Sequence, residues 1–372
     1  IMSELCKWLT TEEPDIFFED TNVGKVKKAV FEASDEEIDR ILEEYGIPAP
    51  SELGMPNTYI QTTNRTAAIE KRRKNDIVFV PIGCTENHGL HANTGLDTFQ
   101  VTQMLEGLRR YTAKQGHECN IAFPALLYGG HPYHHIAMPG TVNMPHEVVQ
   151  ETLIYVMLGL WNDGYRKIIF INNHGHSWML TAAIQEFCKR YQLPGIFRFI
   201  DWHRAIREFF MPVNREGSFQ TSFIHADEIE TSFAKLLFPD MIDMSKAQEA
   251  WPKSLLPNGH FDNSVDAYRR PCTWEMGEGH NAIEIKGTPE GVVGNPKLAT
   301  AEKAKRPTAA FLKYITLVHD EILEAYPAGS VPDPELTTLR SRKELEPFLR
   351  EPLSEGWKSV YEIPRIGVFE KL

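Results

Sequence analysis

The feature that most constrains the fold of this chain is an apolar segment that ends in a cluster of polar side chains. Residues 77–82 read IVFVPI, a composition typical of a strand that is buried on both faces. Directly after it come Glu86, His88, His91 and Asp97, four side chains able to bind a metal. Ligands of open parallel sheets bind beyond the carboxyl ends of the strands. The pattern therefore predicts an α/β protein with a site at the end of this strand.

The residue types in this first segment indicate the kind of ion. Carboxylate and imidazole together suit zinc, manganese or iron better than ions that prefer thiolate. In an extended segment Glu86 and His88 project to the same side, and the glycine-containing loop after them lets Asp97 return to the pair. Taken alone, the segment also fits a solvated turn.

A second segment repeats the design. Residues 167–177 read KIIFINNHGHS, so that an apolar strand runs into a polar turn that carries His174 and His176. Capping of the following helix by an asparagine is the alternative interpretation, because asparagine is a common helix N-cap. Capping accounts for one asparagine and not for the whole set.

A third polar cluster opens a helix that we expect from the apolar spacing of residues 229–237. We interpret Asp227 and Glu228 as capping residues. His225 and Glu230 are site candidates instead, since a helix start favours an anion and raises the cost of protonating a histidine.

Elements of both kinds are expected between these segments. Helices are predicted at residues 34–45, 65–74, 99–111, 147–160 and 178–191, with a final helix ending near residue 325, and strands at residues 120–127 and 195–200. This alternation predicts a single enlarged α/β domain in which helices connect parallel strands. We divide the chain into an N-terminal extension packed on the main domain (1–63), a catalytic domain (64–330) and a C-terminal extension (331–372).

Several loop residues are candidates for contact with a substrate. The loop after residue 127 carries His131, His134 and His135, which we interpret as a substrate wall, although a surface loop with solvated histidines is the alternative. Residues 258–280, with Trp274 and His280, are expected to form a flap or loop over the pocket. Candidate substrate contacts are His91, His131, His135, Trp178 and Trp202. Cys84 is interpreted as a small buried side chain rather than a nucleophile, because unpaired cysteines are usually buried.

Composition narrows the class of protein. The formal net charge of -12 disfavours a surface for nucleic acid or an anionic membrane, and favours chemistry on a small molecule. No apolar run approaches the roughly 20 residues that span a bilayer, and the start lacks a signal-peptide pattern, so we expect a soluble, cytoplasmic protein. The 5 cysteines are scattered, which argues against a disulfide framework or a zinc ribbon.

Together, the three polar segments resemble the creatininase family of metal-dependent hydrolases. The run GCTENHGLHANTGLD is similar to the family signature, MPGTVN resembles its Phe-Pro-Gly-Thr element, and HADEIETS resembles its His-Ala-Gly-Glu-x-Glu-Thr-Ser helix. The resemblance spans about residues 76–305. It implies a creatininase-like three-layer α/β/α fold with a mostly parallel sheet, one or two zinc or manganese ions, a cyclic or amide-like substrate and a homo-oligomer, for which a hexamer is one candidate.

The resemblance also implies roles for individual residues. Glu86, His88, Asp97, His174 and Glu230 fall on metal positions, with Asp97 as the carboxylate that bridges two ions, and His225 matches a catalytic histidine. His176 departs from the family pattern. We take it as a second catalytic candidate, standing where creatinine-hydrolysing members have a ligating glutamate, which puts creatininase activity itself in doubt.

Within the family, FFEDTNVGK, NTYIQTT and the HGHS turn look most like the hydrolases of 3-dehydro-scyllo-inosose in inositol breakdown. The expected reaction is attack of a metal-activated water on one ring carbonyl of this polyhydroxylated cyclic 1,3-diketone, followed by cleavage of a carbon–carbon bond. One alternative is hydrolysis of a cyclic amide or a formyl group, as in creatinine amidohydrolase or a deformylase. The other is a non-catalytic protein that binds metal or carbohydrate.

Overall fold

The centre of the fold is a parallel sheet of four strands. The computed structural model describes residues 7–211, 217–252 and 282–366. The sheet has the strand order β4-β3-β5-β6, formed by β3 (Ile77–Ile82), β4 (Asn120–Ile121), β5 (Lys167–Asn172) and β6 (Ile196–Asp201). Ile82 pairs with Asn172, and Asn172 pairs with Asp201. The carboxyl ends of β3, β5 and β6 therefore meet at one edge.

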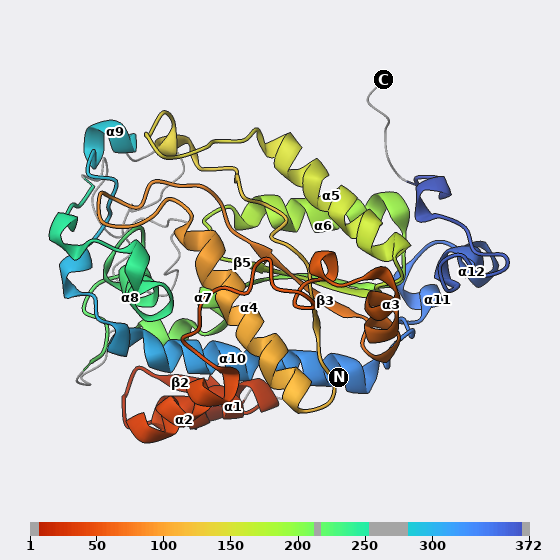
Figure 1. Cartoon of the computed structure of the whole chain (residues 1–372), viewed down its shortest axis with the longest axis horizontal. Coiled ribbons are helices and arrows are strands. Elements are labelled where there is room, and N and C mark those ends of the chain that lie inside the picture. The colour runs from red at the N-terminus through yellow and green to blue at the C-terminus, as the bar shows by residue number, and fades with distance from the viewer. Residues whose placement is uncertain (1–6, 212–216, 253–281, 367–372) are drawn as a thin grey trace.

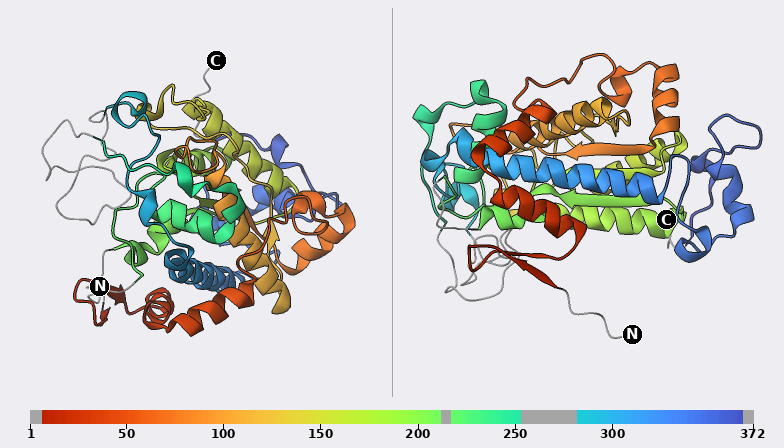
Figure 2. Two further views of the ribbon diagram at one scale, coloured as in Figure 1. Left: turned by 60° about the vertical axis from the view of Figure 1, so that its left-hand side comes forward. Right: turned by 90° about the horizontal axis from the view of Figure 1, so that it is seen from below.

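Helices cover both faces of the sheet, as Figures 1 and 2 show. Helices α5 (His146–Asn162) and α6 (Ser177–Tyr191) share one core with Val78 and Val80, while α4 (Leu96–Lys114) and α10 (Ala301–Ala325) share the other with Ile77 and Phe79. Alternate residues of β3 thus enter opposite cores, as the two-residue period of a strand requires. The prediction of a three-layer α/β/α fold is confirmed.

The N-terminal segment packs on the α10 side. Strands β1 (Trp8–Thr10) and β2 (Phe17–Glu19) form an antiparallel pair, followed by α1 (Asn22–Glu32) and α2 (Asp35–Tyr45), which both contact α10. Ser34 caps α2 by accepting from the Glu37 N–H, and Gly46 ends it in the left-handed conformation. These two caps delimit the helix that the sequence predicted at residues 34–45.

The remaining elements are short, or lie at the ends of the chain. They are η1 (Ile60–Thr62), α3 (Arg65–Lys74), η2 (Tyr133–His135), α7 (Trp202–Ala205), η3 (Arg207–Phe210), α8 (Glu228–Leu237), η4 (Pro239–Met241), η5 (Met244–Lys246), α9 (Glu284–Gly287), η6 (Pro296–Leu298), α11 (Pro334–Thr337), α12 (Arg342–Leu349) and η7 (Val360–Glu362). Leu345 and Phe348 of α12 join the core beneath α5 and α6. The C-terminal segment therefore closes one end of that core.

Two expectations need correction, and a third concerns residues that the structure does not describe. The strand predicted at residues 120–127 has only two residues, because Pro124 interrupts it before Leu126 bridges back to Ile82. Asp97 lies in the first turn of α4 rather than in the preceding loop. The expected flap at residues 258–280 lies outside the described residues.

Among the described residues, no helix combines the length and apolar character needed to cross a membrane.

Candidate metal centre

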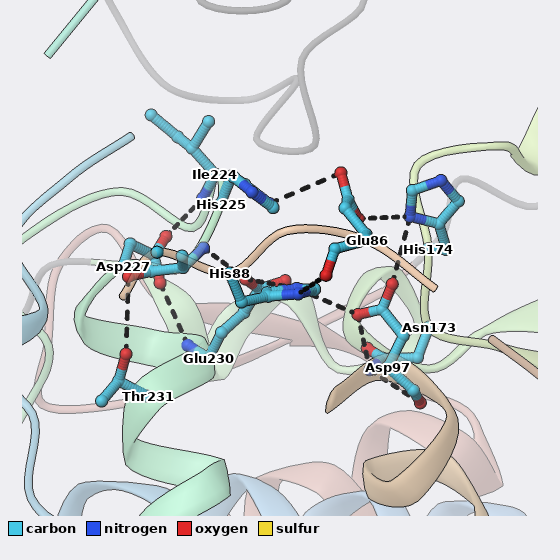
Figure 3. A network of polar contacts seen from close by, with 12 residues as sticks. Glu86, His88, Asp97, Asn173, His174, Ile224, His225, Asp227, Glu230 and Thr231 are labelled. Atoms are coloured by element: carbon cyan, nitrogen blue, oxygen red, sulfur yellow. Dashed lines mark hydrogen bonds and ion pairs between the residues drawn. The ribbon is translucent and has the colours of Figure 1, made fainter. Parts of the chain in front are cut away.

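Five side chains from distant parts of the sequence converge beyond the carboxyl edge of the sheet (Figure 3). Glu86 and His88 follow β3, Asp97 begins α4, His174 follows β5 and Glu230 lies on α8. All five are buried. The structure therefore brings together the whole ligand set that the sequence predicted.

His88 is held in the tautomer that a metal ligand needs. Its Nδ1 lies 3.1 Å from the Glu86 carbonyl oxygen, which can only accept a hydrogen bond, so Nδ1 carries the proton. Its Nε2 lies 3.5 Å from Asp97 Oδ1 and 3.5 Å from Glu230 Oε2, and has no hydrogen-bond partner among the residues that the structure describes. A buried lone pair between two carboxylates fits a divalent cation.

His174 completes a second set of donors on the other side of Asp97. Its Nδ1 lies 2.9 Å from Glu86 Oε2 and 3.1 Å from Asp97 Oδ2. Asp97 thus faces His88 with one oxygen and His174 with the other, as a carboxylate between two ions would. Potential ligand atoms gather on each side of Asp97, and within a group they all lie within 4.8 Å of one another. One group is His88, Asp97 and Glu230, and the other is Cys84, Glu86, His131 and His174. The residues present fit one or two divalent ions.

Electrostatics in the cluster favour cations. Burial lowers the pKa of both His88 and His174, but the nearby carboxylates of Asp97, Glu86 and Glu230 outweigh burial and raise each pKa to about 10. Burial raises the pKa of Glu230 well above its ordinary value. Protons and a metal ion compete for these same lone pairs, so ion binding is coupled to proton release.

His225 has one nitrogen fixed and the other directed at the cluster. Its Nε2 donates to the Asn87 carbonyl oxygen at 2.6 Å, which leaves the lone pair on Nδ1, 3.7 Å from Glu86 Oε1. Burial lowers the pKa of His225 to about 3, so the ring is neutral. The N-cap Asp227 holds this turn by accepting from the Ile229 and Glu230 N–H groups at 2.7 and 3.0 Å.

A cavity that opens to solvent lies beside the cluster. Its polar wall includes Glu86, Glu230, His134, His135, His174, His203, His225 and Glu284, and its apolar wall includes Phe223, Ile224 and Val293. This mixture suits a small molecule that carries several polar groups.

Two of the predicted substrate histidines lie by the cluster. His135 lines the cavity, with Nδ1 2.9 Å from Glu86 Oε1, and His131 Nδ1 lies 3.3 Å from His135 Nδ1. His91 is buried on the α8 side instead, where its Nε2 lies 3.0 Å from the Thr231 hydroxyl.

The structure does not bring His176, Trp178 or Trp202 to the cavity wall. His176 is fully buried, with Nε2 2.9 Å from Asn172 Oδ1, and the fully buried Trp202 donates from Nε1 to Asn173. Both therefore support the turn that carries His174. Trp178 is half exposed and packs against His146, with 6.1 Å between the ring centroids.

Cys84 and Glu284 are two further members of the site. Cys84 is fully buried, with Sγ 3.1 Å from Asp97 Oδ2, and burial raises the pKa of its thiol, in keeping with a packed side chain rather than a nucleophile. Glu284, on the cavity wall, was not among the residues that the sequence singled out. It follows no predicted strand and starts no apolar helix.

Comparison with known proteins decides the family. The family model for creatininase, described as creatinine amidohydrolase, matches residues 61–318. A 3-dehydro-scyllo-inosose hydrolase from Thermotoga maritima is 41% identical over 303 residues, which cover 82% of this chain and 96% of that protein. This chain belongs to the creatininase family. The sequence-based prediction of a hydrolase of this family is confirmed.

More distant creatininases share the architecture. A creatinine amidohydrolase from Pseudomonas putida is 22% identical over 231 residues, covering 57% of this chain and 82% of that protein. The crystal structure of a creatinine amidohydrolase has a TM-score of 0.55 at 17% identity, covering 73% of this chain and 98% of that chain. A manganese creatininase has a TM-score of 0.54 at 17% identity, with coverages of 73% and 99%. At such identities the likeness to the solved structures shows the fold.

Proposed function

We propose that this creatininase-family chain is a metal-dependent hydrolase that opens the ring of 3-dehydro-scyllo-inosose, a cyclic 1,3-diketone of inositol breakdown. The observation that carries the proposal is the 41% identity to the Thermotoga maritima hydrolase across 96% of its length. The buried cluster beside a polar cavity supports it, because the reaction needs an activated water next to a hydroxylated ring.

We assign the metal positions from the geometry of the cluster. His88, Asp97 and Glu230 would hold one ion, and Glu86, His174 and Asp97 would hold a second. Zinc and manganese are the proposed ions, since both are named for solved creatininases. An ion bound there supplies a water made acidic enough to attack and a positive charge for the carbonyl oxygen.

The protein's own groups move protons and position the ring. Water adds to one ring carbonyl, the bond to the carbon between the two carbonyls breaks, and that carbon takes up a proton to give a linear keto acid. His225 is the proposed proton carrier, because Nδ1 keeps its lone pair while Asn87 holds the Nε2 proton. Phe223, Ile224 and Val293 limit the water around the ring.

Three broader features are also proposed, the first on the family resemblance and the other two on the sequence pattern. They are assembly into a homo-oligomer, a cytoplasmic location, and the division of the chain at about residues 63 and 330. The net charge of -12 also supports a small-molecule substrate over nucleic acid or an anionic membrane.

Product analysis in heavy-oxygen water tests the function. The zinc- or manganese-loaded protein, incubated with 3-dehydro-scyllo-inosose, should yield a linear keto acid with one heavy oxygen in its new carboxylate, detected by mass spectrometry. Absence of ring opening with both ions would contradict the proposal.

A creatinine amidohydrolase is the second candidate, favoured by the family model and by the Pseudomonas putida relative. His176 argues against it: the ring is turned to Asn172, away from the cavity that the candidate ligands line. Creatine formation from creatinine, without keto-acid formation from the diketone, would reverse the order of the two candidates.

A further inference from the structure

Glu284, the first residue of α9, presents a buried carboxyl group to the cavity. The residue is 3% exposed, yet neither carboxylate oxygen has a hydrogen-bond partner among the described residues. Burying a carboxyl group without hydrogen bonds is costly. Since Glu284 lines the cavity, a molecule that enters the cavity can supply the missing donors.

The nearest imidazoles lie within ion-pair distance of Glu284 but form no hydrogen bond with it. His135 Nε2 is 3.4 Å from Glu284 Oε1, but its Nδ1 lies 2.9 Å from Glu86. His225 Nε2 is 4.0 Å from Glu284 Oε1 and donates to Asn87 instead. Glu284 therefore stands one imidazole away from the candidate metal ligand Glu86. A six-membered ring with its carbonyl at the cluster can reach it.

We propose that Glu284 is a substrate-recognition residue whose carboxyl group hydrogen-bonds neighbouring hydroxyl groups of a polyhydroxylated six-membered ring. The inference rests on the proposed function and names the side chain that distinguishes a hydroxylated ring from a plain one. Two carboxylate oxygens match two adjacent hydroxyl donors, whereas Phe223, Ile224 and Val293 on the cavity wall offer no acceptor in their side chains. Burial raises the pKa of Glu284 to about 7, so near neutral pH the group can both accept and donate.

Two other roles for Glu284 make different predictions. As an additional metal ligand it would change the metal content when replaced, although it belongs to none of the ligand groups found among the described residues. As a purely structural partner of His135 it would affect every substrate equally.

The test compares a hydroxylated and a plain ring. We expect Glu284→Ala to lower kcat/KM for 3-dehydro-scyllo-inosose about 10- to 100-fold, mainly through KM, while kcat/KM for cyclohexane-1,3-dione changes less than about twofold. Metal content, measured by mass spectrometry, should stay at the parent value. Glu290→Gln is the matched control, because Glu290 lies on the same segment but does not line the cavity. Equal losses for both diketones, no loss for either, or a changed metal content would overturn the inference.

Polyol binding separates this inference from the proposed reaction. If the parent protein opens neither diketone, calorimetry with scyllo-inositol still tests recognition. At least about tenfold weaker binding by Glu284→Ala than by the parent supports the role. Equal binding by the two proteins, or no binding by the parent, overturns it.

Discussion

A backbone carbonyl group sets the tautomer of His88. The Glu86 oxygen holds the Nδ1 proton of His88, so the other nitrogen must present its lone pair to Asp97 and Glu230. The same device acts on His225 through the Asn87 carbonyl. Peptide groups of the loop after β3 thus set the tautomers of two histidines in the site.

Replacing His88 tests its assignment as a ligand. We expect His88→Ala to reduce the bound zinc or manganese by at least one ion per chain and to lower kcat at least about 10³-fold, because the lone pair between two carboxylates is lost. Metal analysis after dialysis measures this. His117→Ala, at a half-buried histidine near the amino end of β4, should keep its metal. Full metal content in His88→Ala would contradict the assignment.

Glu106 offers a pH test away from the metal. Burial raises its pKa above 4.5, although the hydrogen bond from Tyr59 opposes this. The folded state therefore keeps a proton that the unfolded chain has lost, and the stability contribution falls as pH rises from 4.5 through the raised value.

The variant Glu106→Gln keeps a carbonyl acceptor for Tyr59 and cannot ionise. Its free energy of unfolding relative to the parent should therefore increase as the pH rises above 4.5, as measured in urea titrations. The exposed Glu43→Gln should show no such trend. A difference that is constant with pH would argue against the raised pKa.

Sequence reasoning succeeded for residues tied to a repeated pattern. Glu86, His88 and His174 follow apolar strands, and Glu230 begins an apolar helix, so their approximate positions follow from local periodicity. Glu284 was not identified from the sequence because its position depends on the contact between α9 and η2, which no local pattern indicates.

His176 shows that the alternation of side chains along an extended strand does not continue into the turn after β5. Strand-like spacing would aim His174 and His176 at the same side, but the His176 N–H donates to the His174 carbonyl oxygen at 2.8 Å. This tight turn sets the two rings at 82° to each other. His176 therefore faces Asn172 instead of the cavity.

At the scale of elements, the close approach of α4 to the end of β3 positions Asp97. A Cβ on Gly83 would lie 2.5 Å from the Thr98 nitrogen and 2.6 Å from its Cα, so only glycine allows this packing. Thr98 directly follows Asp97 in the first turn of α4.

We expect Gly83→Ala to push that turn outward, lowering the free energy of unfolding by about 1–3 kcal/mol and weakening metal binding. Gly159→Ala is the control, since a Cβ there meets nothing closer than the Tyr361 hydroxyl at 3.6 Å, and α5 should gain about 0.5–1 kcal/mol. Denaturant titration and metal calorimetry measure both effects. Unchanged metal affinity in Gly83→Ala would show that Asp97 is held by other contacts.

Long elements were predictable because burial imposes their period. Strand β3 and helix α3 match the predicted residues 77–82 and 65–74 exactly, and α4, α5 and α6 differ only at their ends. The pair β1 and β2, with three residues each, was not predicted, because segments this short carry little periodicity.

At the scale of the whole molecule, the candidate ligands bring one helical layer and the edge of the sheet together. Candidate donors come from the loops after β3 and β5, from α4 and from α8, so an ion would tie the helical layer that contains α4 and α8 to the sheet edge (Figure 3). The sequence indicated this convergence only because parallel strands end at a common edge.

Removing the metal should therefore destabilise the fold. Ion binding at 100 times Kd contributes about 2.7 kcal/mol, so chelation should lower Tm by several degrees. The drop should shrink from pH 8 to pH 6, because protons compete for His88 and His174, whose pKa values are raised to about 10. Scanning calorimetry with and without chelator measures it. Identical Tm values at pH 8 would count against a shared ion.

Anomalous scattering from crystals grown with zinc or manganese tests the central claim most directly. The account predicts a peak at about 2.0–2.2 Å from His88 Nε2 that also touches Asp97 and Glu230, with any second peak between Glu86 and His174. Crystals that bind the ion only elsewhere, for example at His117, His319 and Asp320, would contradict it.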